Sequence, residues 1–191
     1  MKSMAKWTSL LFVASISLMF SLASLATVPE PAKPVNTAVA GSDDRAFVEQ
    51  ALHSGQMEVA MARIAQEKAA DQSVKETARM LEREHEELNR KLQGLLTTAP
   101  GASSQGTLSQ AQIAAANADM KTMQELQGDR FDSEYVAMMV MHHNASILKF
   151  EEASNNEKLS AGVKQLALDA LPTLRRHAAA AQGLQASLAA R

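Results

Sequence analysis

The sequence predicts an all-α protein, a four-helix bundle with a long crossover that contains an extra helix. Three observations lead to this prediction. Good helix formers dominate the composition, whereas the 191 residues include only 5 prolines and 8 glycines. Apolar residues recur at alternating spacings of four and three, as in bundle helices. No run of β-branched residues alternates with period two, so no strand is expected.

The first residues have the composition of a secretory signal peptide. Lys2 and Lys6 form a positive region, an uncharged and largely apolar stretch runs from Thr8 to Ala23, and Ser24-Leu25-Ala26 is a small-x-small cleavage site. We therefore expect cleavage after Ala26 and export to the periplasm or cell envelope of a bacterium. The alternative is an uncleaved membrane anchor, since the uncharged stretch is nearly long enough to span a bilayer.

The composition that remains after cleavage excludes some kinds of binding partner and some kinds of functional site. Loss of residues 1–26 removes two lysines and no acidic residue, so the formal net charge changes from −2 to −4. No basic patch with interleaved aromatic residues remains, so nucleic acid is not expected as a partner. A protein partner or a homo-oligomer stays open, and no transmembrane span is expected after cleavage. The lack of cysteine excludes disulfides, thiolate metal sites and a cysteine nucleophile.

The rest of the chain divides into a linker and one domain. Residues 27–42 contain three prolines among small residues and are expected to form an extended tether. The domain, residues 43–190, is long enough to bury a core of its own. Its apolar periodicity and its breaks predict helices over residues 43–70, 73–97, 107–127, 129–154 and 158–188.

Local signals mark the starts of two helices and a bend in another. Ser73 with Glu76, and Thr107 with Gln110, have the spacing of capping boxes, in which each side chain serves a backbone donor at the helix start. Pro172 lies inside the last predicted helix, where it is expected to produce a kink.

The lengths of the connections predict the order of the helices. The turns near residues 71 and 156 are short, so the helices on either side of each turn are antiparallel. The middle connection has about 30 residues with ~20 in a helix, and such a helix spans ~30 Å. It can return the chain to its starting end, which gives the up-down-down-up order of ferritin-like folds. A plain up-down-up-down bundle with a decorated loop is the alternative.

Polar residues interrupt the inward faces of four predicted helices. Glu58 lies 13 residues before Asp71 and His85 lies 14 after it, so the two are expected at the same height. His143 lies 14 residues before Glu157 and His177 lies 20 after it, an offset of ~9 Å at 1.5 Å per residue. We therefore expect the first three to meet in mid-bundle, with His177 a turn or more away.

These residues are candidate metal ligands, although a buried histidine more often only hydrogen-bonds a neighbouring carbonyl or carboxylate. Glu82 and His85 have the Glu-x-x-His spacing of di-iron bundles. A second copy is missing because Leu174 stands three residues before His177. A standard di-iron centre is therefore not expected.

A cluster of methionine and histidine supplies secondary candidates. Met138 with His142, and Met139 with His143, are i,i+4 pairs, and thioether with imidazole suits copper. Methionines at helical spacing are also ordinary core residues, and the chain has 11 of them. No catalytic motif is recognisable, so no catalytic residue is assigned. The identity of any cofactor stays open among copper, zinc and iron.

Several motifs occur in order along the domain: Gly55-Gln56-Met57-Glu58-Val59, Glu84-His85 with Asn89, Phe131-Asp132-x-x-Tyr135, His143, Phe150 and Leu171-Pro172-Thr173-Leu174-x-x-His177. Their order and spacing resemble the bacterial domain-of-unknown-function 4142 family, which is assigned to the ferritin-like bundles. The resemblance implies fold and export but no established activity. It also implies family-type positions at Glu58, His85, Phe131, Asp132, Tyr135, His143, Leu171, Pro172 and His177, with His142 as an addition of this chain.

The sequence ranks three classes of function. We first expect an exported helical bundle of uncharacterised activity, a non-catalytic envelope or stress-related binding or structural module. The alternative is a metal-binding bundle that uses the buried glutamate and histidines. An enzyme is the least favoured class, because no catalytic signature is present.

Overall fold

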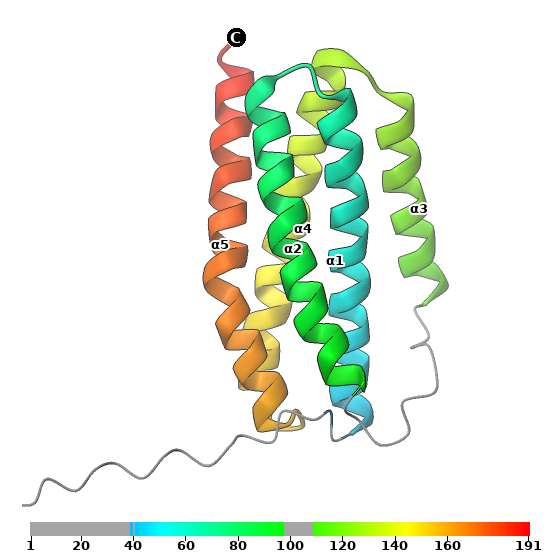
Figure 1. Ribbon diagram of the computed structural model, residues 1–191, viewed down its shortest axis with the longest axis vertical. Helices are drawn as coiled ribbons and strands as arrows, with labels where there is room; N and C mark the ends of the chain where they lie inside the picture. The colour runs from blue at the N-terminus through cyan, green and yellow to red at the C-terminus, as the bar shows by residue number, and fades with distance from the viewer. Residues whose placement is uncertain (1–38, 40, 98–108) are drawn as a thin grey trace, which may run out of the picture. The chain divides into compact units, whose positions relative to one another are not determined.

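The computed structural model describes residues 39, 41–97 and 109–191, which form five helices and no strand. The helices are α1 (Ser42–Lys68), α2 (Gln72–Thr97), α3 (Gln110–Glu125), α4 (Gly128–Asn155) and α5 (Ala161–Ala189) (Figure 1). The all-α prediction is confirmed. The predicted signal peptide and nearly all of the linker lie outside the described residues. None of the described helices is apolar enough over a sufficient length to cross a membrane.

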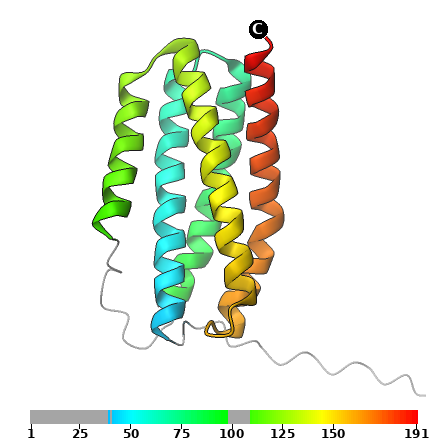
Figure 2. The same ribbon diagram turned by 180° about the vertical axis from the view of Figure 1, so that it is seen from behind.

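The four long helices follow the predicted order. In both views α1 and α2 run antiparallel, as do α4 and α5, and α3 lies beside α1 and α4 (Figures 1 and 2). Because α3 returns the chain to the end where α1 finished, α4 runs in the same direction as α2. The up-down-down-up arrangement with a helical crossover is therefore present, and the plain up-down-up-down alternative is wrong.

Two predicted capping boxes are corrected. The helix α2 begins at Gln72, and Asp71 caps it by accepting from the backbone N–H groups of Ser73 at 2.7 Å and Val74 at 3.1 Å. The Ser73–Glu76 box is wrong because a better cap precedes it and places Ser73 inside the first turn.

The start of α3, the crossover helix, also differs from the prediction. A capping box does form at α3, but between Ser109 and Gln112, whose reciprocal bonds measure 3.2 and 2.8 Å. Gln110, the expected partner of Thr107, is instead the first residue of the helix. Thr107 itself lies outside the described residues. Both segments fit the same sequence pattern, and serine is the stronger cap.

The core of the bundle consists of two apolar clusters with a polar layer between them. One cluster lies toward the α4–α5 turn and contains Val48, Leu52, Leu92, Phe150, Val163 and Leu174, among others. The other lies toward the α1–α2 turn and contains Met61, Val74, Leu81, Met123, Phe131, Tyr135 and Met139, among others. Along each long helix, the sequence passes from one cluster to the other at a buried polar residue.

Two buried aspartates tie the helical hairpins together. Asp132, near the start of α4, accepts from the backbone N–H groups of Ala70 at 3.1 Å and Asp71 at 2.7 Å, in the α1–α2 turn. Asp44, near the start of α1, accepts from the N–H of Ser160 at 2.8 Å, just before α5. Each hairpin therefore holds the turn of the other, which fixes their relative height.

Candidate metal centre

Each of the four long helices contributes one buried polar side chain to the layer between the apolar clusters. These are Glu58 from α1, His85 from α2, His143 from α4 and His177 from α5, and none is more than 3% exposed. Their places follow from helical periodicity, because each continues an inward-facing stripe. Buried polar groups need partners, so four of them in one layer must be explained by what they face.

The structure corrects the expected place of His177, which belongs to the centre. Its Nδ1 lies 3.2 Å from His143 Nε2. The count from Glu157 overestimated the offset for two reasons. The helix α5 begins three residues later than predicted, at Ala161 with Ser160 as its cap, so the midpoint of the turn lies further along the chain. Side chains also lean toward the start of their own helix, which brings these two rings together from opposite directions.

The donor atoms of these residues lie close together, since each of the three imidazoles offers a nitrogen within 4.8 Å of the others and Glu58 adjoins two of them. His85 Nε2 lies 2.9 Å from Glu58 Oε2 and 3.2 Å from His143 Nε2, and His143 Nε2 lies 3.3 Å from the same carboxylate oxygen. Ligands at 2.0–2.1 Å from a tetrahedral metal ion are separated from one another by ~3.3 Å. The separations of 3.2–3.3 Å from His143 Nε2 to its three neighbouring donors are close to this value.

Outer contacts fix which nitrogen of two rings carries the proton. His143 Nδ1 lies 2.9 Å from the carbonyl oxygen of Met139, which can only accept, so Nδ1 donates. His177 Nε2 donates in the same way to the carboxylate of Glu84 at 2.9 Å, and Arg176 pairs with that carboxylate. Metal-bound histidines are oriented by such contacts to carbonyl and carboxylate groups.

Burial and charge set the protonation of the metal-free centre. Burial alone would raise the pKa of Glu58, but His85 and His143 outweigh it and lower that pKa to about 2. Burial alone would lower the pKa of His85, but the charge of Glu58 raises it above its usual value. Burial lowers the pKa of His143 and brings that of His177 to about 4. These directions favour an ion pair between Glu58 and His85, beside two imidazoles that bind a proton less readily than usual.

Neutral rings with these tautomers leave two lone pairs directed at each other. His143 Nε2 and His177 Nδ1 are both acceptors, 3.2 Å apart, and no hydrogen bond can join them without a proton or a cation between them. Some buried polar atoms of the described residues also lack an aligned hydrogen-bond partner. Among them are Glu58 Oε2, His85 Nδ1 and Asn89 Oδ1. The residues present therefore fit a cation in chemistry as well as in spacing.

The secondary candidates lie elsewhere. Glu82 contacts Arg63 and Gln66, at 2.7 and 2.5 Å, on the surface between α1 and α2. His142 Nε2 lies 3.1 Å from Asp119 Oδ2 and so joins α4 to the crossover helix. Met138 and Met139 pack in the cluster near the α1–α2 turn. Of this group, only Met139 serves the centre, through its backbone carbonyl.

The remaining family-type positions are structural in the described fold. Phe131 and Tyr135 stack with ring centroids 6.1 Å apart, and Asp132 holds the α1–α2 turn. Leu171 is buried in the cluster near the α4–α5 turn, and α5 is continuous through Pro172. The role of Glu84 as the partner of His177 was not predicted from the sequence. The position of Glu84 beside His85 gave no sign of it, because Glu84 reaches across to α5.

The fold and the site define an all-α bundle in which each of four helices supplies one side chain to a buried cluster of three histidines and a glutamate. The chain belongs to the family described as Domain of unknown function (DUF4142), whose model matches residues 28–184. Neither the curated proteins nor the solved structures gave a match.

Proposed function

We propose that the protein is an exported metal-binding bundle that holds one transition-metal ion with Glu58, His85, His143 and His177. The observation that carries the proposal is the buried cluster itself, in which three imidazoles each offer a nitrogen within 4.8 Å of the others and the Glu58 carboxylate lies 2.9 and 3.3 Å from two of them. Three nitrogens and one carboxylate oxygen are a donor set acceptable to zinc, copper and iron. Binding requires His85 to give up its proton, so affinity is expected to fall as the pH is lowered.

Metal titration of the mature protein, purified without a histidine tag, tests this proposal. One equivalent of zinc or copper is expected to raise the unfolding temperature of the metal-stripped protein. At a free metal concentration of 100 times the Kd, the stabilisation amounts to about 2.7 kcal/mol. His143→Gln should abolish most of the shift. His142→Gln, a change of the neighbouring histidine outside the centre, should preserve it. A shift that is absent from the wild type or equal in both variants contradicts the proposal.

A purely structural polar layer is the second candidate. It is favoured by the charge distribution of the metal-free centre, in which the carboxylate of Glu58 already pairs with His85, 2.9 Å away. In that case the centre would specify how the four helices align, and zinc and copper would leave the unfolding temperature unchanged. The same titration therefore separates the two candidates.

Export is proposed from the signal-like N-terminal segment. We expect the mature protein to begin near Thr27, because the apolar stretch ends at a small-x-small site. Mass spectrometry of the protein from the cell-envelope fraction measures this directly. An intact Met1 in detergent-extracted protein would identify an anchored protein instead.

A further inference from the structure

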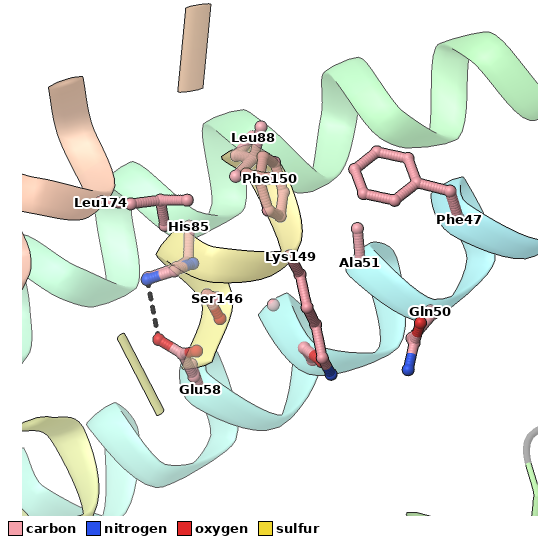
Figure 3. A pocket seen from close by; sticks show the side chains of 12 residues that line it. Phe47, Gln50, Ala51, Glu58, His85, Leu88, Ser146, Lys149, Phe150 and Leu174 are labelled. Carbon is pink, nitrogen blue, oxygen red and sulfur yellow. Dashed lines mark ion pairs between the residues drawn. The ribbon is translucent and has the colours of Figure 1, made fainter. Parts of the chain in front are cut away.

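A small cavity adjoins the proposed centre inside the bundle. It offers about 20 Å³ to a water-sized molecule, and roughly 10–15 Å³ is enough to hold one. Glu58 and His85 lie at one end, and Phe47 lies at the other, where it meets Phe150 edge to face (Figure 3). Ala51 and Gly55 of α1 line it, and at Gly55 the Asn89 side chain of α2 comes so close that a Cβ would clash with its Oδ1.

Polar side chains line the cavity between the centre and the surface. Gln50 and Ser54 of α1 and Ser146 and Lys149 of α4 contribute to its wall, and Lys149 is exposed. At the inner end, His85 is at least nine-tenths buried and its Nδ1 has no hydrogen-bond partner among the described residues. The cavity therefore joins the centre to an exposed lysine through a wall in which these polar groups alternate with apolar side chains such as Leu88, Phe150 and Leu174.

The charges around the cavity determine whether a cation or an anion is favoured inside it. Among the described residues of the wall, Glu58 is the only acidic one, and Lys149 contributes a positive charge. With a divalent ion bound, the charge of Glu58 is more than neutralised by the metal. The cavity then has a positive centre at its inner end and a lysine near its mouth, and the other described residues of its wall are uncharged, some polar and some apolar. Such a space attracts a small anion.

We propose that this cavity is the position of an exogenous ligand of the metal ion, and that it takes one small monovalent anion such as hydroxide or azide. The inference rests on the metal-binding function proposed above. It assigns Lys149 a role in attracting the anion, and it assigns Ser54 and Ser146 to the wall of the cavity. With Glu58 and the three histidines as protein ligands, the anion would be a fifth ligand, and a site that accepts an exogenous ligand is open rather than closed.

Azide binding to the copper-loaded protein tests the inference, with azide-to-copper charge-transfer absorption as the readout. Azide is expected to bind with one-to-one stoichiometry. Ser54→Leu fills the cavity without changing a metal ligand and should weaken azide binding about tenfold or more, a loss of ~1.4 kcal/mol. Ser54→Ala, the matched control, leaves the cavity open and should bind azide as the wild type does. Lys149→Gln should weaken binding about two- to fivefold, as expected for one partly screened charge.

Copper content is measured on the same samples, so the two proposals fail separately. A protein that binds no copper overturns both of them. A protein that binds one copper ion but shows no azide band overturns only the anion site. Equal azide affinity in Ser54→Leu, Ser54→Ala and the wild type also overturns it, because the anion would then reach the metal by another route. If Ser54→Leu does not fold, an unchanged affinity in Lys149→Gln has the same meaning.

Discussion

Glu58→Gln is expected to lower the free energy of unfolding of the metal-free protein by about 3–5 kcal/mol near pH 6, the usual cost of removing one partner from a buried ion pair. The side chain keeps its size, so the loss reports the charge. The contact concerned is the 2.9 Å pair between Glu58 Oε2 and His85 Nε2, in which both side chains are almost completely buried. Urea unfolding of the metal-stripped protein measures the change.

The stabilisation by the Glu58–His85 pair is expected to depend on pH, and the pKa shifts predict in which direction. The pKa of His85 is raised on folding, so its stabilising contribution is complete below about pH 6.5 and is lost as the pH rises through its folded value. The pKa of Glu58 is lowered to about 2, so its contribution is complete above about pH 4.5 and is lost as the pH falls toward 2. The pair therefore stabilises most between these limits.

The two other histidines, His143 and His177, make the folded protein less stable when the pH is lowered. The pKa values of His143 and His177 are lowered on folding, so both groups reduce stability as the pH falls below about 6.5. The wild type should therefore be most stable near that pH. In Glu58→Gln the decline above it should flatten, because His85 no longer gains a proton on folding.

Glu87→Gln provides the control for both measurements. Glu87 is 58% exposed and pairs with Lys91 on the surface of α2, so its replacement should cost less than about 1 kcal/mol. The centre does not contain a buried ion pair if Glu58→Gln lowers the free energy of unfolding no more than this control does. The same conclusion follows if the stability of Glu58→Gln declines above about pH 6.5 as steeply as that of the wild type.

Asp132→Ala should destabilise the protein by about 2–4 kcal/mol, because it removes the acceptor of two backbone N–H groups in the α1–α2 turn. Hydrogen bonds to an ionised acceptor are stronger than neutral ones, and Asp132 is only 1% exposed. Thermal and urea unfolding measure the loss. Metal stabilisation should survive in part, since no donor of the centre is removed.

Asp129→Ala is the matched control in the first turn of the same helix. Asp129 is exposed, and its replacement should cost no more than about 1 kcal/mol through its interaction with the helix start. A similar cost for both variants would show that the contribution of Asp132 comes from its position in the helix. The bonds to Ala70 and Asp71 would then add little.

The sequence was sufficient to predict the helices, their order and three members of the centre. Strong apolar periodicity indicated the helices, and the lengths of the turns indicated which pairs are antiparallel. His177 was misplaced because a count from the turn neglects the length of the turn itself and the direction in which side chains lean. A few ångströms decide whether a side chain belongs to a site, and residue counting does not resolve them.

Other features depend on contacts that no local pattern encodes. The bond from His177 on α5 to Glu84 on α2 joins two residues that are 93 positions apart in the chain, and it decides which ring nitrogen faces the centre. The caps of α2 and α3 were ambiguous in the sequence, because two residues close together could each cap the helix. These are Asp71 and Ser73 at α2, and Thr107 and Ser109 at α3. The cavity beside Glu58 is lined by residues of all four long helices, so only the assembled bundle defines it.

The crossed bonds of Asp44 and Asp132 also bear on how the centre responds when an ion arrives or leaves. These hydrogen bonds lie at opposite ends of the bundle. If one hairpin slid past the other by a helical turn, about 5.4 Å, the bonds of both aspartates would break. Two of the four donors belong to each hairpin, and sliding is the motion that would separate them. With this motion blocked, the donors are pre-organised, and little of the binding free energy is spent on assembling the site.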